Sequence, residues 1–152
     1  MMSQLLNFSI ENRDKGVIGR QGKKHWDSMK FAEFNALDVT LQSIVLYAVF
    51  VACARFGRAT IITSMYRASG GVHALFRGCD IDVDHKVKYG GLTPAEAGFI
   101  VDEINSIYQY DPDRPDFKVA VYNLTGEKAR KFGPHITHIH FQSKPGKTVF
   151  VG

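Results

Sequence analysis

Apolar residues recur at helical spacing from Phe31 to Phe56, and this pattern predicts a helix. The second half of the stretch is apolar on all sides, as expected of a helix that packs against a sheet. Gly57 follows the last periodic residue, and glycine commonly ends helices because it adopts a left-handed conformation without strain. The pattern therefore predicts one long core helix that ends at Phe56.

A second helix is predicted within residues 92–110, LTPAEAGFIVDEINSIYQY. Thr93 is a favourable N-cap, Pro94 suits the first helical position, and Glu96 three residues after the cap completes a capping box. The amphipathic spacing is continued by Ile100, Ile104, Ile107 and Tyr108.

Strand patterns occur in four stretches, at residues 59–64, 79–84, 117–124 and 133–142. In CDIDVD the two-residue period places Asp80, Asp82 and Asp84 on one face. Two helices and four strands with hairpin-length or irregular connections predict an α+β fold, with a largely antiparallel sheet flanked by helices. A chain of 152 residues has the size of one domain, so we expect a single domain over residues 1–152.

The composition fits a soluble globular chain, and the formal net charge of +4 favours anionic partners. Nucleic acid is not expected, because no Lys/Arg cluster with interleaved aromatic residues appears.

The start of the chain has no basic region followed by an apolar run, so we expect synthesis in the cytoplasm without a secretory signal. The apolar run at residues 43–54 is shorter than the roughly 20 residues that span a bilayer, so no transmembrane segment is expected. We expect Cys53 and Cys79 to be packing residues without a disulfide, and the sequence leaves the oligomeric state open.

The candidate chemistry begins with GPHITHIHFQ, residues 133–142, which holds three of the six histidines. A two-residue period sends His138 and His140 to one face of a strand, and Ile139 and Phe141 to the other. Such a pair is compatible with an ordinary solvated strand or with a zinc site.

Further ligands are available from HALFRGCD, where His73 lies in a loop and Asp80 early in a strand. Together with His140 they make a set of two histidines and one aspartate. Three protein ligands leave a fourth position for water, which is the form of a catalytic zinc site rather than a structural one.

At these residues the chain resembles the zinc peptidase superfamily that groups D-Ala-D-Ala carboxypeptidases and dipeptidases, lysostaphin-type and murein endopeptidases, and the Hedgehog signalling domain. The carboxypeptidase branch carries Ser-x-Tyr-Arg after a strand, then His-x6-Asp, then a segment ending in a ligand histidine. The matching segments are TSMYR (Ser64, Tyr66, Arg67), HALFRGCD (His73, Asp80) and HITHIH (His140). The resemblance covers about residues 40–143 and implies a Hedgehog/DD-peptidase-like fold.

Roles follow from the resemblance position by position. The implied zinc ligands are His73, Asp80 and His140, and the implied substrate-binding residues are Ser64, Tyr66 and Arg67. The resemblance implies that Arg67 neutralises a substrate carboxylate or the developing oxyanion, although a surface ion pair is the alternative for this residue. His138 is implied to stabilise the tetrahedral intermediate.

The chain also departs from this pattern. Thr137 occupies the place of the usual general-base glutamate, and a threonine hydroxyl is no base near neutral pH. The His-x-x-His-x-His arrangement is similar to the murein endopeptidase A subgroup and makes His135 the candidate base, with an exposed loop histidine as the alternative. Gly71 stands where a serine is usual. Asp82 competes with Asp80 as a ligand, or holds a ligand imidazole or Arg67 in place.

The expected activity is zinc-dependent hydrolysis of amide bonds in peptidoglycan stem peptides or cross-links. A protein made in the cytoplasm that cuts the wall after release or delivery is typical of a phage endolysin. A phage virion component and a host enzyme exported by another route are the alternatives. The sequence leaves open which bond is cut, and whether the enzyme is a carboxypeptidase or an endopeptidase. The main alternative is a catalytically inactive zinc-containing binding module, and a nucleic-acid-binding domain would rest on the charge alone.

Overall fold

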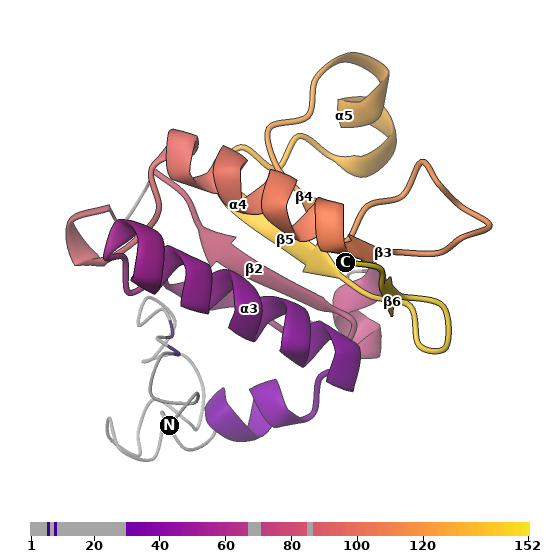
Figure 1. Cartoon of the computed structure of the whole chain (residues 1–152), viewed down its shortest axis with the longest axis horizontal. Helices are drawn as coiled ribbons and strands as arrows, with labels where there is room; N and C mark the ends of the chain where they lie inside the picture. Colours follow the sequence, from indigo (N-terminus) through magenta and orange to yellow (C-terminus); the bar gives the residue numbers. More distant parts are fainter. Residues whose placement is uncertain (1–5, 7, 9–29, 67–70, 85–86) are drawn as a thin grey trace.

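The computed structural model describes residues 6, 8, 30–66, 71–84 and 87–152. Within them the chain has a small α+β fold with a mostly antiparallel sheet (Figure 1). The elements are α3 (Val39–Phe56), β1 (Ile62–Ser64), η2 (Gly71–Leu75), β2 (Gly78–Asp82), η3 (Val87–Tyr89), α4 (Pro94–Ile107), β3 (Tyr108–Gln109), β4 (Ala120–Val121), α5 (Gly126–Phe132), β5 (His138–Gln142) and β6 (Val149–Phe150).

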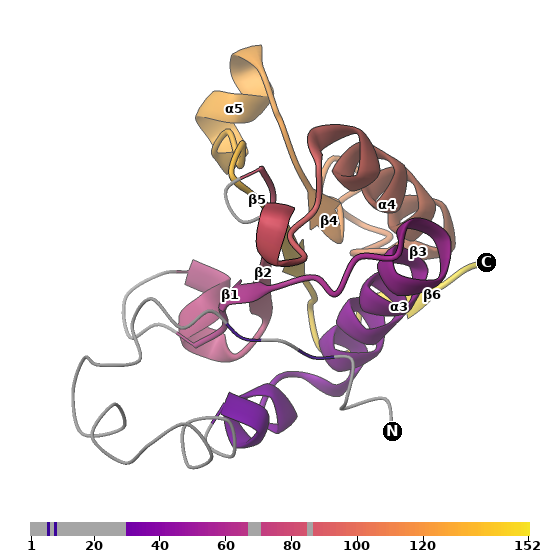
Figure 2. The same ribbon diagram turned by 90° about the vertical axis from the view of Figure 1, so that its left-hand side faces the viewer.

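The larger sheet has the strand order β1-β2-β5-β4, with antiparallel pairing throughout, and β3 pairs with β6 in a separate ribbon. Figure 2 shows α3 and α4 together on one side of this sheet. The core lies between the helices and the sheet, where Ile139 and Phe141 of β5 are fully buried. His138 and His140 alternate with them and belong to the opposite face. The alternation predicted for this strand is confirmed.

The long helix predicted from Phe31 to Phe56 is interrupted. Residues 30–35 are helical and α3 begins at Val39. Asp38 has ψ 133°, which is outside the helical region, and the Gln42 side chain donates to the carbonyl oxygens of Asn35 and Leu37 across the break. The break turns the chain so that Leu37, only 2% exposed, is buried in the core.

The predicted start of the second helix is confirmed. The Thr93 hydroxyl accepts from the Glu96 backbone N–H, the Glu96 carboxylate accepts from the Thr93 N–H, and Pro94 opens the helix. These two reciprocal bonds satisfy N–H groups that have no partner inside the helix.

The strands are shorter than predicted, because residues with positive φ limit them. Thr60 (φ 50°) precedes β1, Asp84 (φ 69°) follows β2, and His135 (φ 48°) precedes β5. Asp84 is therefore exposed and outside the strand, which corrects the expectation that it shares a face with Asp80 and Asp82. Asn123 (φ 52°) lies just after β4, and only two residues of the predicted strand remain in the sheet.

By length and composition alone, α3 is long and apolar enough to cross a membrane. The same test is passed by core helices of soluble proteins, and six residues of α3 are buried against the rest of the fold: Leu41, Ile44, Val45, Ala48, Val49 and Ala52. Cys79 is buried in the core as expected, whereas Cys53 is exposed on α3, and both are free thiols.

Candidate metal centre

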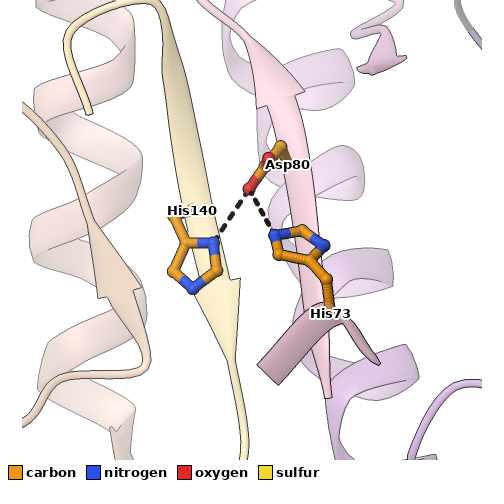
Figure 3. A group of neighbouring side chains, drawn as sticks. All are labelled: His73, Asp80 and His140. Atoms are coloured by element: carbon orange, nitrogen blue, oxygen red, sulfur yellow. Dashed lines mark hydrogen bonds and ion pairs between the residues drawn. The ribbon is translucent and has the colours of Figure 1, made fainter. Parts of the chain in front are cut away.

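The pairing of β2 with β5 places Asp80 directly opposite His140. Residues opposite one another in an antiparallel pair direct their side chains to the same face. The third residue, His73, comes from η2, which packs against β2. Figure 3 shows the two imidazole rings on either side of the Asp80 carboxylate. One ligand atom from each of the three residues lies within 4.8 Å of the others, so this buried group could hold a metal ion.

The His73 ring is held in one tautomer. Its Nδ1 lies at hydrogen-bonding distance from the carbonyl oxygen of Met65. A carbonyl oxygen only accepts, so Nδ1 carries the proton and Nε2 of the neutral ring presents a lone pair. That Nε2 is buried without a hydrogen-bond partner and faces Asp80 Oδ1 at 3.4 Å.

Gly78 makes room for this ring. A Cβ atom at Gly78 would lie 3.0 Å from His73 Cδ2, which is closer than an ordinary van der Waals contact. The small residue at this position therefore allows η2 to bring the imidazole against β2.

Asp80 is a carboxylate at neutral pH. Burial by itself raises the pKa of this carboxyl group, but a hydrogen bond with His140, the nearby His73 ring and the charges of His140 and His138 outweigh it. The pKa of Asp80 therefore lies well below its ordinary value. His140 Nδ1 lies 2.9 Å from Asp80 Oδ1, the same oxygen that faces His73.

The donor set fits a divalent cation. The unpartnered lone pair of His73 Nε2 faces an anionic oxygen, and a metal cation between the two atoms would relieve this repulsion. The Met65 carbonyl behind the ring is the kind of hydrogen bond that orients metal-binding imidazoles. Two imidazoles and one carboxylate are ligands that zinc accepts.

A cavity of about 560 Å³ opens beside the three residues. Its wall includes His73 and Asp80, together with Phe132 and residues 134–138. A space of this size beside the cluster accommodates a small ligand or part of a chain.

His135 and His138 form a hydrogen-bonded pair in this wall. His135 Nε2 donates to the carbonyl oxygen of Phe132 at 2.7 Å, so its Nδ1 is the acceptor, and His138 Nε2 donates to it at 2.9 Å. The Thr137 hydroxyl is 3.2 Å from His138 Nδ1. Burial lowers the pKa of His135, as do the charges of His140 and His138, so its ring is neutral near pH 7.

The other predicted site residues differ in where they lie relative to the cluster and the cavity wall. Asp82 is buried and pairs with His138 in the β2–β5 register, one step along the same face from Asp80. Ser64 pairs with Asp80 across β1 and β2. Tyr66 stacks on Phe76 with ring centroids 4.6 Å apart. Among the described residues, neither Ser64 nor Tyr66 belongs to the cavity wall, and Arg67 lies outside the described residues.

The sequence reasoning missed Gln142 and Phe132, which also line the cavity. Gln142 is two residues beyond His140 on the same strand face, so the period that linked the histidines would have included it. Phe132 ends a helix that has no buried residue and therefore no apolar stripe in the sequence.

Comparison with protein families, with characterised proteins and with solved structures gives no match to this chain.

Proposed function

We propose that the protein is a zinc-dependent peptidase that hydrolyses amide bonds in peptidoglycan stem peptides or cross-links, on a Hedgehog/DD-peptidase-like fold. The observation that carries this proposal is the buried cluster itself. Ring nitrogens of His73 and His140 converge on one oxygen of Asp80 beside a cavity. A purely structural site would close around its ion with a fourth protein ligand, whereas three ligands beside a cavity suit catalysis.

Zinc held by these residues would supply the Lewis acidity that lowers the pKa of water and polarises a carbonyl group. His138 Nε2 lies 3.9 Å from Asp80 Oδ2, so this N–H is next to the cluster. We assign it to stabilising negative charge on an attacked carbonyl oxygen. His135 Nδ1 accepts from the same N–H, and we assign the general-base role to this neutral imidazole, acting with His138.

An anionic substrate suits the site. Two neutral imidazoles and one carboxylate leave a zinc site with one net positive charge, and the chain itself carries +4. Peptidoglycan stem peptides carry free carboxyl groups, and we propose that Arg67 binds one of them. The endolysin role and action on the wall after release or delivery belong to the same proposal.

The test is mass spectrometry of soluble fragments released from purified murein sacculi by the zinc-loaded protein. We expect fragments cut at a peptide bond, and their masses identify the bond. Chelator and His140→Ala should abolish release, whereas Leu75→Ala, an exposed change in the same short helix as His73, should not.

Two observations favour the alternative function, a zinc-containing binding module without activity. Thr137 stands where the resembling enzymes have a glutamate, and both ring nitrogens of His135 already make hydrogen bonds. A protein that binds zinc in equimolar ratio but releases no fragments from any wall preparation would establish that alternative. Failure of the pure protein to take up a divalent cation would contradict both functions.

A further inference from the structure

The side chain of Gln142 connects the end of β5 to the chain before β4. Its Nε2 donates to the carbonyl oxygen of Lys118 at 2.8 Å, and its backbone N–H donates to the carbonyl oxygen of Val119 at 2.9 Å. A carbonyl oxygen cannot donate, so the first bond fixes which end of the amide is nitrogen. The other end, Oε1, therefore faces His140 Nε2 at 3.3 Å.

The orientation of the Gln142 amide determines which nitrogen of His140 is left for a metal ion. Because Oε1 only accepts, His140 Nε2 must carry a proton to bond with it. Nδ1 lies 2.9 Å from Asp80 Oδ1, which also only accepts. A metal ion that binds the ring takes the place of a proton on one nitrogen, and because the bond to Gln142 holds the Nε2 proton, that nitrogen is Nδ1.

The two histidines are thus held in the same way. His73 donates from Nδ1 to the Met65 carbonyl and presents Nε2 to Asp80, whereas His140 donates from Nε2 to Gln142 and presents Nδ1. In both rings an oxygen acceptor on the far side holds one proton, so the nitrogen left for a metal ion is the one beside the Asp80 carboxylate. Hydrogen bonds of this kind fix the tautomer of metal-binding histidines and raise their basicity.

We propose that Gln142 is a positioning residue that makes His140 bind the metal through Nδ1. This inference rests on the proposed zinc site and adds a residue that acts on it through His140. The chain of contacts runs from the Lys118 backbone through Gln142 and His140 to Asp80.

The test compares Gln142→Met, which keeps the approximate side-chain size and removes the acceptor, with wild type. The matched control is Gln109→Met on the exposed ribbon strand β3. We measure zinc affinity by competition with a chromophoric chelator. We expect about 10- to 100-fold weaker binding for Gln142→Met, as for the loss of other supporting partners of metal ligands, and no change for Gln109→Met.

The second readout is the nitrogen chemical shift of the His140 ring in the zinc-loaded protein, observed by long-range proton–nitrogen correlation. In wild type we expect a protonated Nε2 and a zinc-bound Nδ1. A zinc-bound Nε2 in wild type overturns the inference whether or not the variant folds. Equal zinc affinity of wild type and Gln142→Met also overturns it, while leaving the proposed function intact. A wild type that binds no zinc overturns the proposed function itself, and the inference with it.

Discussion

Asp80 lies directly opposite His140 in the pairing of β2 with β5, and Asp80 Oδ1 is 2.9 Å from His140 Nδ1 although the two residues are 60 positions apart in the chain. The strand register therefore creates the candidate metal centre. A slip of one residue would move His140 to the core face and bring Ile139 to the carboxylate. The fully buried Ile139 and Phe141 prevent this slip, since it would expose them on the cavity side.

Replacement of Asp80 by asparagine should abolish stabilisation by zinc. The amide of Asp80→Asn keeps the shape of the carboxylate but loses its charge, and its NH2 group can donate to the lone pair of His73 Nε2 that the carboxylate repels. We therefore expect a folded metal-free variant. Zinc at 100 times its dissociation constant should stabilise wild type by about 2.7 kcal/mol and should leave the variant unchanged.

Thermal unfolding with zinc and with chelator measures this difference. Asp116→Asn is the control, because Asp116 is an exposed partner of Lys131 and should leave the response to zinc intact. An Asp80→Asn protein that zinc still stabilises as much as wild type would remove Asp80 from the ligand set.

Gly78→Ala should weaken metal binding through His73. The new methyl group would lie 3.0 Å from both His73 Cδ2 and Val72 Cγ2, so the ring must move by a few tenths of an ångström. The ring is buried and hydrogen-bonded to Met65, so it has little freedom to move. We expect a loss of about tenfold in zinc affinity, comparable to other disturbances behind a metal ligand.

The matched control is Gly98→Ala in α4, where a Cβ atom meets nothing within 4 Å. This change should leave zinc affinity intact and stabilise the helix by up to about 1 kcal/mol. Equal zinc affinities for the two variants would show that the space beside His73 is not needed for binding.

The ionised carboxylate of Glu96 should stabilise the fold near neutral pH, and this stabilisation should be lost in acid. Burial opposes ionisation of this carboxyl group, but hydrogen bonds from the Thr93 backbone and hydroxyl, together with Arg58, lower its pKa below the ordinary value. A group with a lowered folded-state pKa stabilises the protein above its unfolded pKa, about 4.3, and this contribution is lost as the pH falls through the folded value. In Glu96→Gln the capping bond is retained and the charge is lost.

At pH 7 we expect Glu96→Gln to be less stable than wild type by about 0.5–1 kcal/mol, the usual scale for a partly exposed ion pair. Urea unfolding across pH 7 to 3 should show this gap narrowing below pH 4.3 and closing in stronger acid. Glu127→Gln, at the exposed start of α5, serves as the control. If the difference in stability between wild type and Glu96→Gln stays constant with pH, the charge of Glu96 does not cause it.

The sequence predicted the parts of the structure that depend on local patterns. The two-residue period placed His138 and His140 on one face, and the capping box placed the start of α4. It could not predict α5, because this charged helix has no buried residue. The orientation of His73 depends on a backbone carbonyl, which any residue at position 65 would supply, so no side-chain pattern reveals it.

His135 and His138 should act as one unit in catalysis. His138 Nε2 donates to His135 Nδ1 at 2.9 Å, and the two rings make an edge contact with centroids 5.0 Å apart. Neither belongs to the three-residue ligand set, so both alanine variants should retain zinc in equimolar ratio. In each variant, kcat for the release of murein fragments should fall about 100-fold or more, as expected for loss of a general acid or base.

The double variant tests the coupling. Residues that work through one hydrogen bond lose their contribution together, so His135→Ala with His138→Ala should be no slower than the slower single variant by more than a few-fold. Val149→Ala is the control, since this residue of β6 is exposed and does not line the cavity. Losses that multiply in the double variant would show that the two imidazoles act independently. Loss of zinc in either single variant would instead make that histidine a metal ligand.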